Sequence, residues 1–82
     1  MEFQEIFLKQ LLGNVFGINP NTVGGQTSID TVESWDSLKH LELVIALEQG
    51  FQVTFTEEET VEILNYKLIK MILEKHGIKF II

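Results

Sequence analysis

Apolar positions near the start of the chain recur at the spacing of a helix. Within residues 2–16 they fall three or four residues apart, which places them on one helical face. The residues of this face are Phe3, Ile6, Phe7, Leu11, Leu12 and Val15. Gly17 follows them, and glycine readily adopts the left-handed conformation that ends helices. The pattern therefore predicts an amphipathic helix over residues 2–16, with this face toward the core.

A second helix is predicted to begin at Ser37 and to end at Gly50. Asp36 can cap it, because a carboxylate placed before the first turn accepts backbone N–H groups that have no other partner. A short third helix follows, reaching residue 64. Its signal is the pair Thr56 and Glu59, which has the spacing of a capping box.

A fourth helix is predicted over residues 66–76, with Asn65 as its cap and Gly77 as its end. Its inward face is expected to consist of Leu68, Ile69, Ile72 and Leu73. Trp35 and Tyr66 are expected to be packing residues.

Residues 17–35 are predicted to be a long loop, because they contain Pro20 and many turn-forming residues. A loop of this length in a small domain is often functional. We expect Ile29 and Val32 to attach it to the core. The apolar tail, residues 78–82, either folds back onto the bundle or forms an exposed contact. The whole pattern predicts an all-α fold without a sheet: a four-helix bundle in one domain, residues 1–82, with a long first loop and a short third helix.

Charge and composition exclude several classes of protein. Twelve acidic residues face six basic ones, which gives a net charge of −6. Such a surface disfavours nucleic acid and anionic lipid and favours partners with basic patches. The chain has no cysteine, so a disulfide, a thiolate zinc site and a thiol nucleophile are excluded. No apolar run approaches the roughly 20 residues that span a bilayer, and the acidic start does not resemble a signal peptide. We expect a cytoplasmic monomer that binds neither nucleic acid nor membrane.

Ser37 is the residue best placed to carry chemistry. It stands at the first position of a predicted helix, after a long polar loop. A phosphate on its oxygen would lie beside free N–H groups and the positive end of the helix dipole. Taken alone, Asp36 and Ser37 also suit a helix start that has no chemical role.

The surroundings of Ser37 resemble the acyl carrier protein family. The resemblance rests on Asp36-Ser37-Leu38, on the helical run from Leu41 to Glu48, on Phe51 and on the acidic residues 57–59. It extends to the end of the first helix, residues 11–18, and to residues 27–29 in the loop. The resemblance implies an acyl-carrier-like bundle in which Ser37 receives 4′-phosphopantetheine from coenzyme A. Asp36 and Leu38 flank that site, and no residue is expected to be catalytic or to bind a metal.

The resemblance also implies partners and the residues that contact them. The partners are a phosphopantetheinyl transferase and the enzymes that load and process acyl groups: acyl-ACP synthetase, ketosynthase and acyltransferase. The arm would carry acyl intermediates as thioesters for fatty acid, polyketide or other specialised acyl biosynthesis. The positions that match partner contacts are Leu38, Leu41, Glu42, Ile45, Glu48, Glu57 and Glu58.

Some positions depart from the main fatty-acid carriers, which commonly have Gly-Ala before the motif, carboxylates along the second helix and a proline before the third. These positions are Ser34, Trp35, Lys39, Gln49, Thr54 and Thr56. The departures are compatible with a carrier dedicated to a specialised pathway. The alternative function is an acidic helical adaptor that binds another protein and has no prosthetic group; a hydrolase that depends on Ser37 is a more distant one.

Three weaker signals have simpler interpretations. His40 lies three residues after Ser37, and we interpret it as a solvated surface residue, although it could touch the phosphate of the arm. Residues 19–30 have the length of a calcium loop but lack its carboxylates, so we reject a calcium site there. Loose association of divalent ions with Glu57, Glu58 and Glu59 is more plausible.

Overall fold

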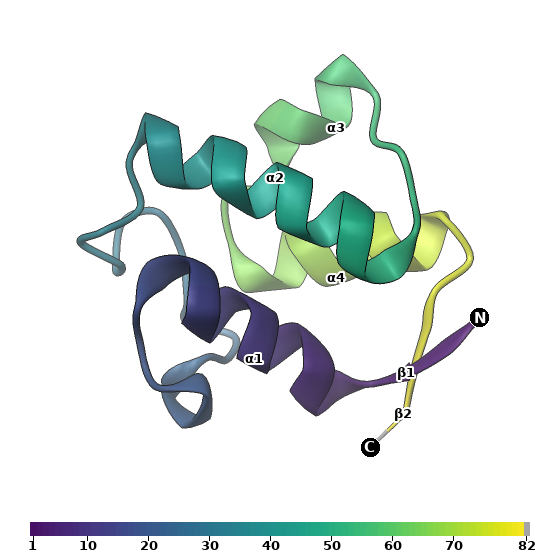
Figure 1. Cartoon of the computed structure of the whole chain (residues 1–82), viewed down its shortest axis with the longest axis horizontal. Coiled ribbons are helices and arrows are strands. Elements are labelled where there is room, and N and C mark those ends of the chain that lie inside the picture. Colours follow the sequence, from purple (N-terminus) through teal and green to yellow (C-terminus); the bar gives the residue numbers. More distant parts are fainter. Residues whose placement is uncertain (82) are drawn as a thin grey trace.

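The computed structural model describes residues 1–81 and is mostly helical (Figure 1). Its elements, in chain order, are β1 (Glu2–Gln4), α1 (Glu5–Phe16), the 3₁₀ turn η1 (Pro20–Thr22), α2 (Ser37–Phe51), α3 (Glu57–Glu62), α4 (Tyr66–Lys75) and β2 (Lys79–Ile81). The four predicted helices are confirmed, and the third and fourth end slightly earlier than predicted. None of the described helices is long and apolar enough to cross a membrane.

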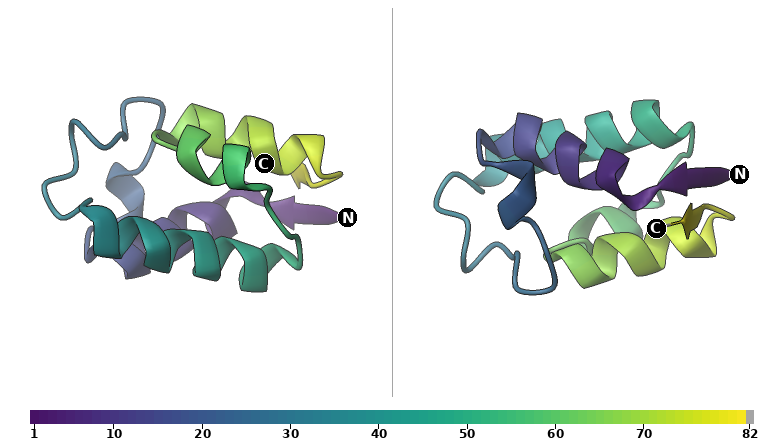
Figure 2. Two further views of the ribbon diagram at one scale, coloured as in Figure 1. Left: turned by 90° about the horizontal axis from the view of Figure 1, so that it is seen from above. Right: turned by 90° about the horizontal axis from the view of Figure 1, so that it is seen from below.

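The prediction of a fold without a sheet is wrong, because the two ends of the described chain pair as parallel strands. Their register joins Glu2 to Lys79, Phe3 to Phe80 and Gln4 to Ile81. Residues 2–4 are therefore extended, and the first helix begins at Glu5. The tail folds back, as one of the two expectations had it, and both ends lie on the same side of the molecule in the views of Figure 2. Ile82 lies outside the described residues.

An aromatic cluster holds the C-terminal tail against the helices through the ring of Phe80. Phe51, at the end of α2, meets Phe3 and Phe80 edge to face, with centroid distances of 4.7 and 5.7 Å. Phe7 joins the same cluster at 5.3 Å from Phe51. These contacts hold both strands against α2, so the pairing does not depend on backbone hydrogen bonds alone.

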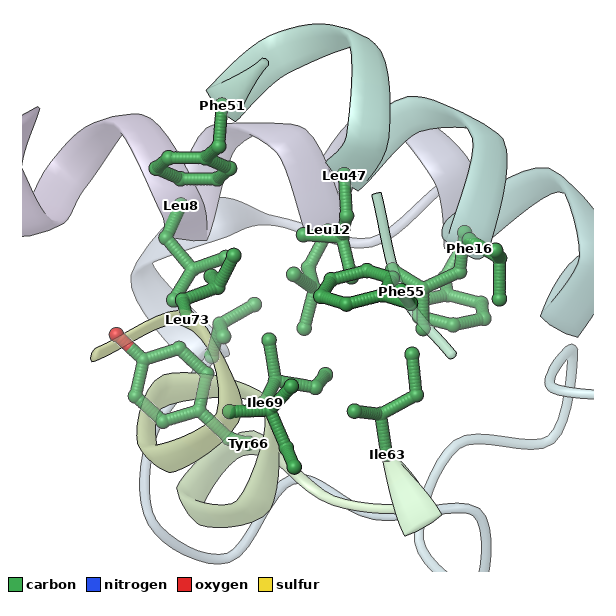
Figure 3. Close-up of a cluster of buried hydrophobic side chains, with 14 of the residues drawn as sticks. Leu8, Leu12, Phe16, Leu47, Phe51, Phe55, Ile63, Tyr66, Ile69 and Leu73 are labelled. Carbon is green, nitrogen blue, oxygen red and sulfur yellow. The ribbon is translucent and has the colours of Figure 1, made fainter. Parts of the chain in front are cut away.

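The core lies between α1, α2 and α4 and is shown in Figure 3. The side of α1 that faces it is centred on Leu8, Leu12 and Phe16, which are all buried. Ile6 and Phe7, which were predicted to point inward, are 42% and 37% exposed. The predicted apolar face of the first helix included Phe3, but Phe3 lies in β1 and not in the helix. The predicted face is therefore rotated relative to the buried one. On α4 the buried residues are Tyr66, Ile69, Ile72 and Leu73, and Leu68 is half-buried.

Gly50 does not end α2, contrary to the prediction. The helix continues to Phe51 and ends at Gln52, whose φ is 56°. A Cβ atom at position 50 would lie 3.0 Å from Cδ1 of Leu11, which is closer than most such contacts. Glycine at this position therefore lets α1 and α2 approach each other.

The loop between α1 and α2 is attached at its far end to the α3–α4 junction. Tyr66 N–H donates to the carbonyl of Thr27 at 2.9 Å, and Ile29 N–H donates to the carbonyl of Leu64 at 3.0 Å. Val32 is buried as predicted, but Ile29 is 41% exposed, because its backbone rather than its side chain makes the attachment. Trp35 and Tyr66 are buried, which confirms their packing role. The loop therefore places the start of α2 close to the end of α3.

Candidate functional site

Ser37 is the first residue of α2, as predicted. Oδ1 of Asp36 accepts the backbone N–H of Lys39 at 2.8 Å, and the Asp36 carbonyl accepts the N–H of His40 at 2.8 Å. The side chain of Ser37 is exposed. Within residues 1–81, no hydrogen bond occupies its hydroxyl or the backbone N–H groups of Ser37 and Leu38. The first turn therefore offers a free hydroxyl beside free donors.

A groove of about 470 Å³ lies beside Ser37. It is lined by Ile29, Asp36, Ser37, His40, Val61 and Leu64. The sequence placed none of the three apolar residues at the site: Ile29 was assigned to the core, and Val61 and Leu64 were simply part of the third helix. These three residues line the groove because the bond between Ile29 and Leu64 brings the loop and the end of α3 next to the start of α2.

The outer face of α2 continues from Ser37 as an apolar surface. Leu38, Leu41 and Ile45 are 65%, 56% and 46% exposed, while the inward side is formed by Leu43, Val44, Leu47 and Phe51. We call Leu38, Leu41 and Ile45 the α2 apolar stripe. These side chains are accessible, as residues that contact partners must be.

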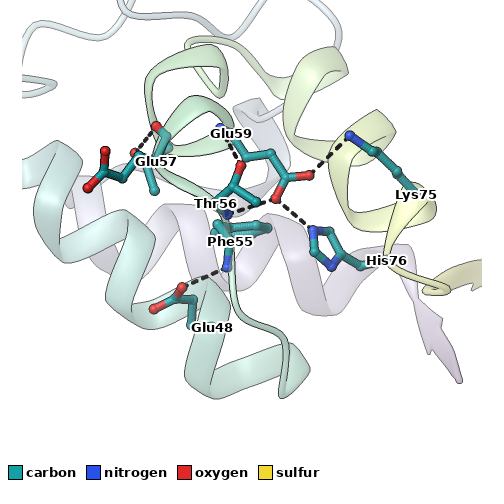
Figure 4. Close-up of polar contacts among 8 residues, drawn as sticks. Glu48, Phe55, Thr56, Glu57, Glu59, Lys75 and His76 are labelled. Atoms are coloured by element: carbon teal, nitrogen blue, oxygen red, sulfur yellow. Dashed lines mark hydrogen bonds and ion pairs between the residues drawn. The ribbon is translucent and has the colours of Figure 1, made fainter.

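The two acidic residues expected to help binding on α2 are both engaged within the chain. Glu42 forms an ion pair with Lys39 at 3.1 Å. Oε2 of Glu48 accepts the backbone N–H of Phe55 at 2.9 Å (Figure 4). Lys39 thus neutralises part of the charge near Ser37, and Glu48 has a structural role that the sequence did not reveal.

The acidic residues of α3 do not act as one group. Glu57 and Glu58 are exposed in the first turn of α3. They are not among the residues that line the groove beside Ser37. Within residues 1–81, no cluster of acidic, histidine or cysteine side chains is arranged to hold a metal ion.

Glu59 is buried and fully engaged, which corrects its grouping with Glu57 and Glu58 as a loose ion site. The predicted capping box is present, since Glu59 Oε1 accepts Thr56 N–H at 2.9 Å and Thr56 Oγ1 accepts Glu59 N–H at 3.1 Å. The carboxylate also meets His76 at 2.8 Å and Lys75 at 3.3 Å (Figure 4). The Thr56 N–H bond first, and then His76 and Lys75, lower the pKa of Glu59 to about 2.

His40 is a half-buried bridge rather than a solvated surface residue, contrary to the prediction. Its Nδ1 accepts the indole N–H of Trp35 at 3.1 Å, and its Nε2 lies 2.6 Å from the carbonyl oxygen of Thr60. An indole nitrogen can only donate a hydrogen bond, so Nδ1 of His40 is the acceptor. The ring proton is therefore on Nε2, which donates a hydrogen bond to the carbonyl oxygen of Thr60. The only sequence signal for this bridge is the placement of Trp35 and His40 on either side of Ser37.

The arrangement provides an accessible hydroxyl, a bordering groove and an apolar stripe. Both ring nitrogens of His40 are occupied elsewhere, so neither activates Ser37 in this arrangement. Compared with known proteins, the chain matches no family model and no curated sequence.

Proposed function

We propose that the chain is an acyl carrier protein and that Ser37 carries 4′-phosphopantetheine through a phosphodiester. The observation that supports this most directly is the exposed Ser37 hydroxyl at the first position of α2, beside backbone N–H groups without partners. The similarity of Asp36-Ser37-Leu38 and its surroundings to acyl carriers motivates the choice of prosthetic group.

The residues present fit the arm. In the modification the Ser37 Oγ–P bond forms as the pyrophosphate bond of coenzyme A breaks, and adenosine bisphosphate leaves. The resulting phosphate would lie within reach of the free N–H groups of Ser37 and Leu38, where the helix dipole also favours negative charge. The arm supplies a terminal thiol that holds acyl groups as thioesters, so a chain without cysteine is suited to this role.

The partners of such a carrier are a phosphopantetheinyl transferase and the enzymes that load and process acyl groups, including acyl-ACP synthetase, ketosynthase and acyltransferase. The α2 apolar stripe, next to Ser37, is the surface that we assign to them. The departures at Lys39 and Gln49 favour service in a specialised acyl or polyketide pathway over the general fatty-acid cycle.

Incubation with coenzyme A and a broad-specificity transferase tests the proposal. Intact mass spectrometry should show the addition of one phosphopantetheine to the wild type and none to Ser37→Ala. Ser34→Ala is the matched control, because Ser34 is close in sequence but its hydroxyl donates to the Phe16 carbonyl at 2.9 Å; it should be modified as the wild type is. An unmodified wild type, or a modified Ser37→Ala, would contradict the carrier function, and the first outcome would favour an adaptor without a prosthetic group.

A further inference from the structure

Helix α3 is too short to be stable by itself. It has six residues, and isolated helices shorter than about 12 residues are marginal in water. Side-chain contacts hold its N-terminal half, through the capping box and the bonds of Glu59 to α4. Its other end, which borders the groove beside Ser37, is anchored by the buried side chain of Ile63 and by the bond from the Ile29 N–H to the Leu64 carbonyl.

His40 adds an attachment from the side of α2. The carbonyl of Thr60 has no continuing helical partner, because Leu64 N–H turns back to the carbonyl of Glu62 at 2.8 Å. Carbonyl groups in the last turn of a helix are commonly left without partners. The Nε2–H of His40 fills this vacancy at 2.6 Å and thereby joins the first turn of α2 to the last turn of α3.

Trp35 fixes the orientation of the bridge. Its indole N–H donates to Nδ1 of His40, and its ring is buried against Phe16 with a centroid distance of 4.6 Å. The indole therefore holds the tautomer of His40 that donates to Thr60. Trp35 and His40 stand on either side of Ser37 in the sequence, so the same two residues that bracket Ser37 connect it to α3.

We propose that His40 is a positioning residue that keeps one wall of the groove, formed by Val61 at the end of α3 and Leu64 just after it, in register with Ser37. The role that we give to this bridge, which is to present Ser37 to the transferase, rests on the proposed carrier function. The geometry of the bridge itself does not depend on that function. His40 acts through Thr60 and takes no part in the chemistry.

Two substitutions distinguish the effect of the His40 hydrogen bonds from the effect of side-chain packing. His40→Leu keeps an apolar side chain of moderate size but removes both hydrogen bonds. His40→Gln keeps an acceptor and a donor, so its amide can replace the two ring nitrogens. If His40 positions α3 by hydrogen bonding, the glutamine variant rescues what the leucine variant loses.

The first measurement is amide hydrogen exchange by NMR on the unmodified protein. The Thr60 N–H donates to the carbonyl of Thr56 at 3.0 Å, so its exchange rate reports the opening of α3. His40→Leu should speed exchange at Thr60 by about 2- to 12-fold, which corresponds to the roughly 0.5–1.5 kcal/mol that a neutral hydrogen bond contributes. Ile69, in α4, is the internal control and should keep its rate. His40→Gln should stay close to the wild type at both amides and leave the chemical shift of the Trp35 indole N–H close to its wild-type value.

The second measurement is the rate of modification of Ser37 by the transferase. His40→Leu should lower kcat/KM by a similar factor, about 2- to 12-fold, and His40→Gln should restore most of it. Equal rates in all three proteins, or unchanged exchange at Thr60 in His40→Leu, would overturn the inference. If the leucine variant does not fold, Trp35→Phe removes the indole donor, together with part of a buried ring, and should change both readouts in the same direction; no change would overturn the inference. An unmodified wild type would refute the carrier function, while the exchange data would still decide whether His40 holds α3.

Discussion

The carboxylate of Glu59 lies 2.8 Å from Nε2 of His76, although 17 residues separate them in the chain. The same oxygen accepts the backbone N–H of Thr56, and the other oxygen meets Lys75. One buried side chain therefore caps the start of α3 and joins it to the end of α4. Helix α3 is thus held at both ends, by Glu59 and by the Thr60 contact with His40.

Acid should release the first of these attachments. The pKa of Glu59 is lowered from 4.5 to about 2 in the folded protein, chiefly by the Thr56 N–H bond and then by His76 and Lys75. A carboxyl group with a depressed folded-state pKa stabilises the fold above its ordinary pKa, and this stabilisation is lost as pH falls toward the folded value. We therefore expect the contribution of Glu59 to be complete above pH 4.5 and to disappear between pH 4.5 and about 2.

Urea unfolding of Glu59→Gln and the wild type over a pH series measures this contribution. Glutamine can still accept the Thr56 N–H, so the variant removes the charge while keeping the cap. It should be less stable than the wild type at neutral pH, and the two curves should converge as pH falls through this range. Parallel curves would mean that the charge of Glu59 does not contribute.

The sequence predicted the helices well because their signals are local. The N-cap at Asp36 and the capping box at Thr56 and Glu59 involve residues at most three positions apart, so the spacing alone was sufficient. The strands were missed because each is three residues long and pairs with a segment near the other end of the chain. Three-residue segments carry too little alternation to be recognised.

The candidate site was predicted only where it lies on one helix. The position of Ser37 follows from the cap at Asp36, and the residues of the α2 apolar stripe were named from the resemblance to acyl carriers. The groove was not predicted, because Val61 and Leu64 reach Ser37 through backbone bonds between the loop and the α3–α4 junction. The bridge from His40 to Thr60 spans 20 residues, and no local pattern indicates such a contact.

The paired tail should contribute measurably to stability. Phe80 is half-buried, packs on Phe51 and lies beneath the ammonium group of Lys70, which is 5.7 Å from its centroid. Complete burial of a phenylalanine makes its replacement by alanine cost about 3–5 kcal/mol, so we expect Phe80→Ala to cost about half of that. Lys79→Ala, at an exposed neighbouring position, should change the free energy of unfolding by less than about 0.5 kcal/mol. Urea unfolding followed by the fluorescence of Trp35 measures both; equal effects would show that the ring does not anchor the tail.

The exposed glutamates at the two ends of α3 should have opposite effects on the thermal stability of the protein. Glu58 lies in the first turn, where the helix dipole favours a negative charge, and Glu62 is the last residue, where it disfavours one. We expect Glu58→Gln to lower the melting temperature slightly and Glu62→Gln to raise it slightly. Thermal melts at low and high salt check the cause, because screening should reduce both shifts. Shifts of the same sign would indicate that overall charge repulsion, rather than position on the helix, dominates.

Partner docking should depend more on the α2 apolar stripe than on the acids of α2. Ile45 is 46% exposed, and covering a side chain of this kind fully is worth about 1.5–3 kcal/mol. Glu48 is already bound to the Phe55 N–H, and exposed ion pairs typically contribute only about 0–1 kcal/mol. We therefore expect Ile45→Ala to weaken binding to a transferase or another cognate enzyme more than Glu48→Gln does.

Binding titrations of the two variants, at low and physiological salt, decide between an apolar and an electrostatic mode of docking. Glu48→Gln is a fair comparison, because its amide oxygen can still accept the Phe55 N–H and so preserve the turn after α2. Circular dichroism and thermal melts must show that both variants remain folded, since Ile45 is partly packed against its neighbours. A larger loss with Glu48→Gln, or an affinity that collapses as salt rises, would mean that charge selects the partner. In that case Glu57 and Glu58, which remain exposed on α3, would be the residues to neutralise next.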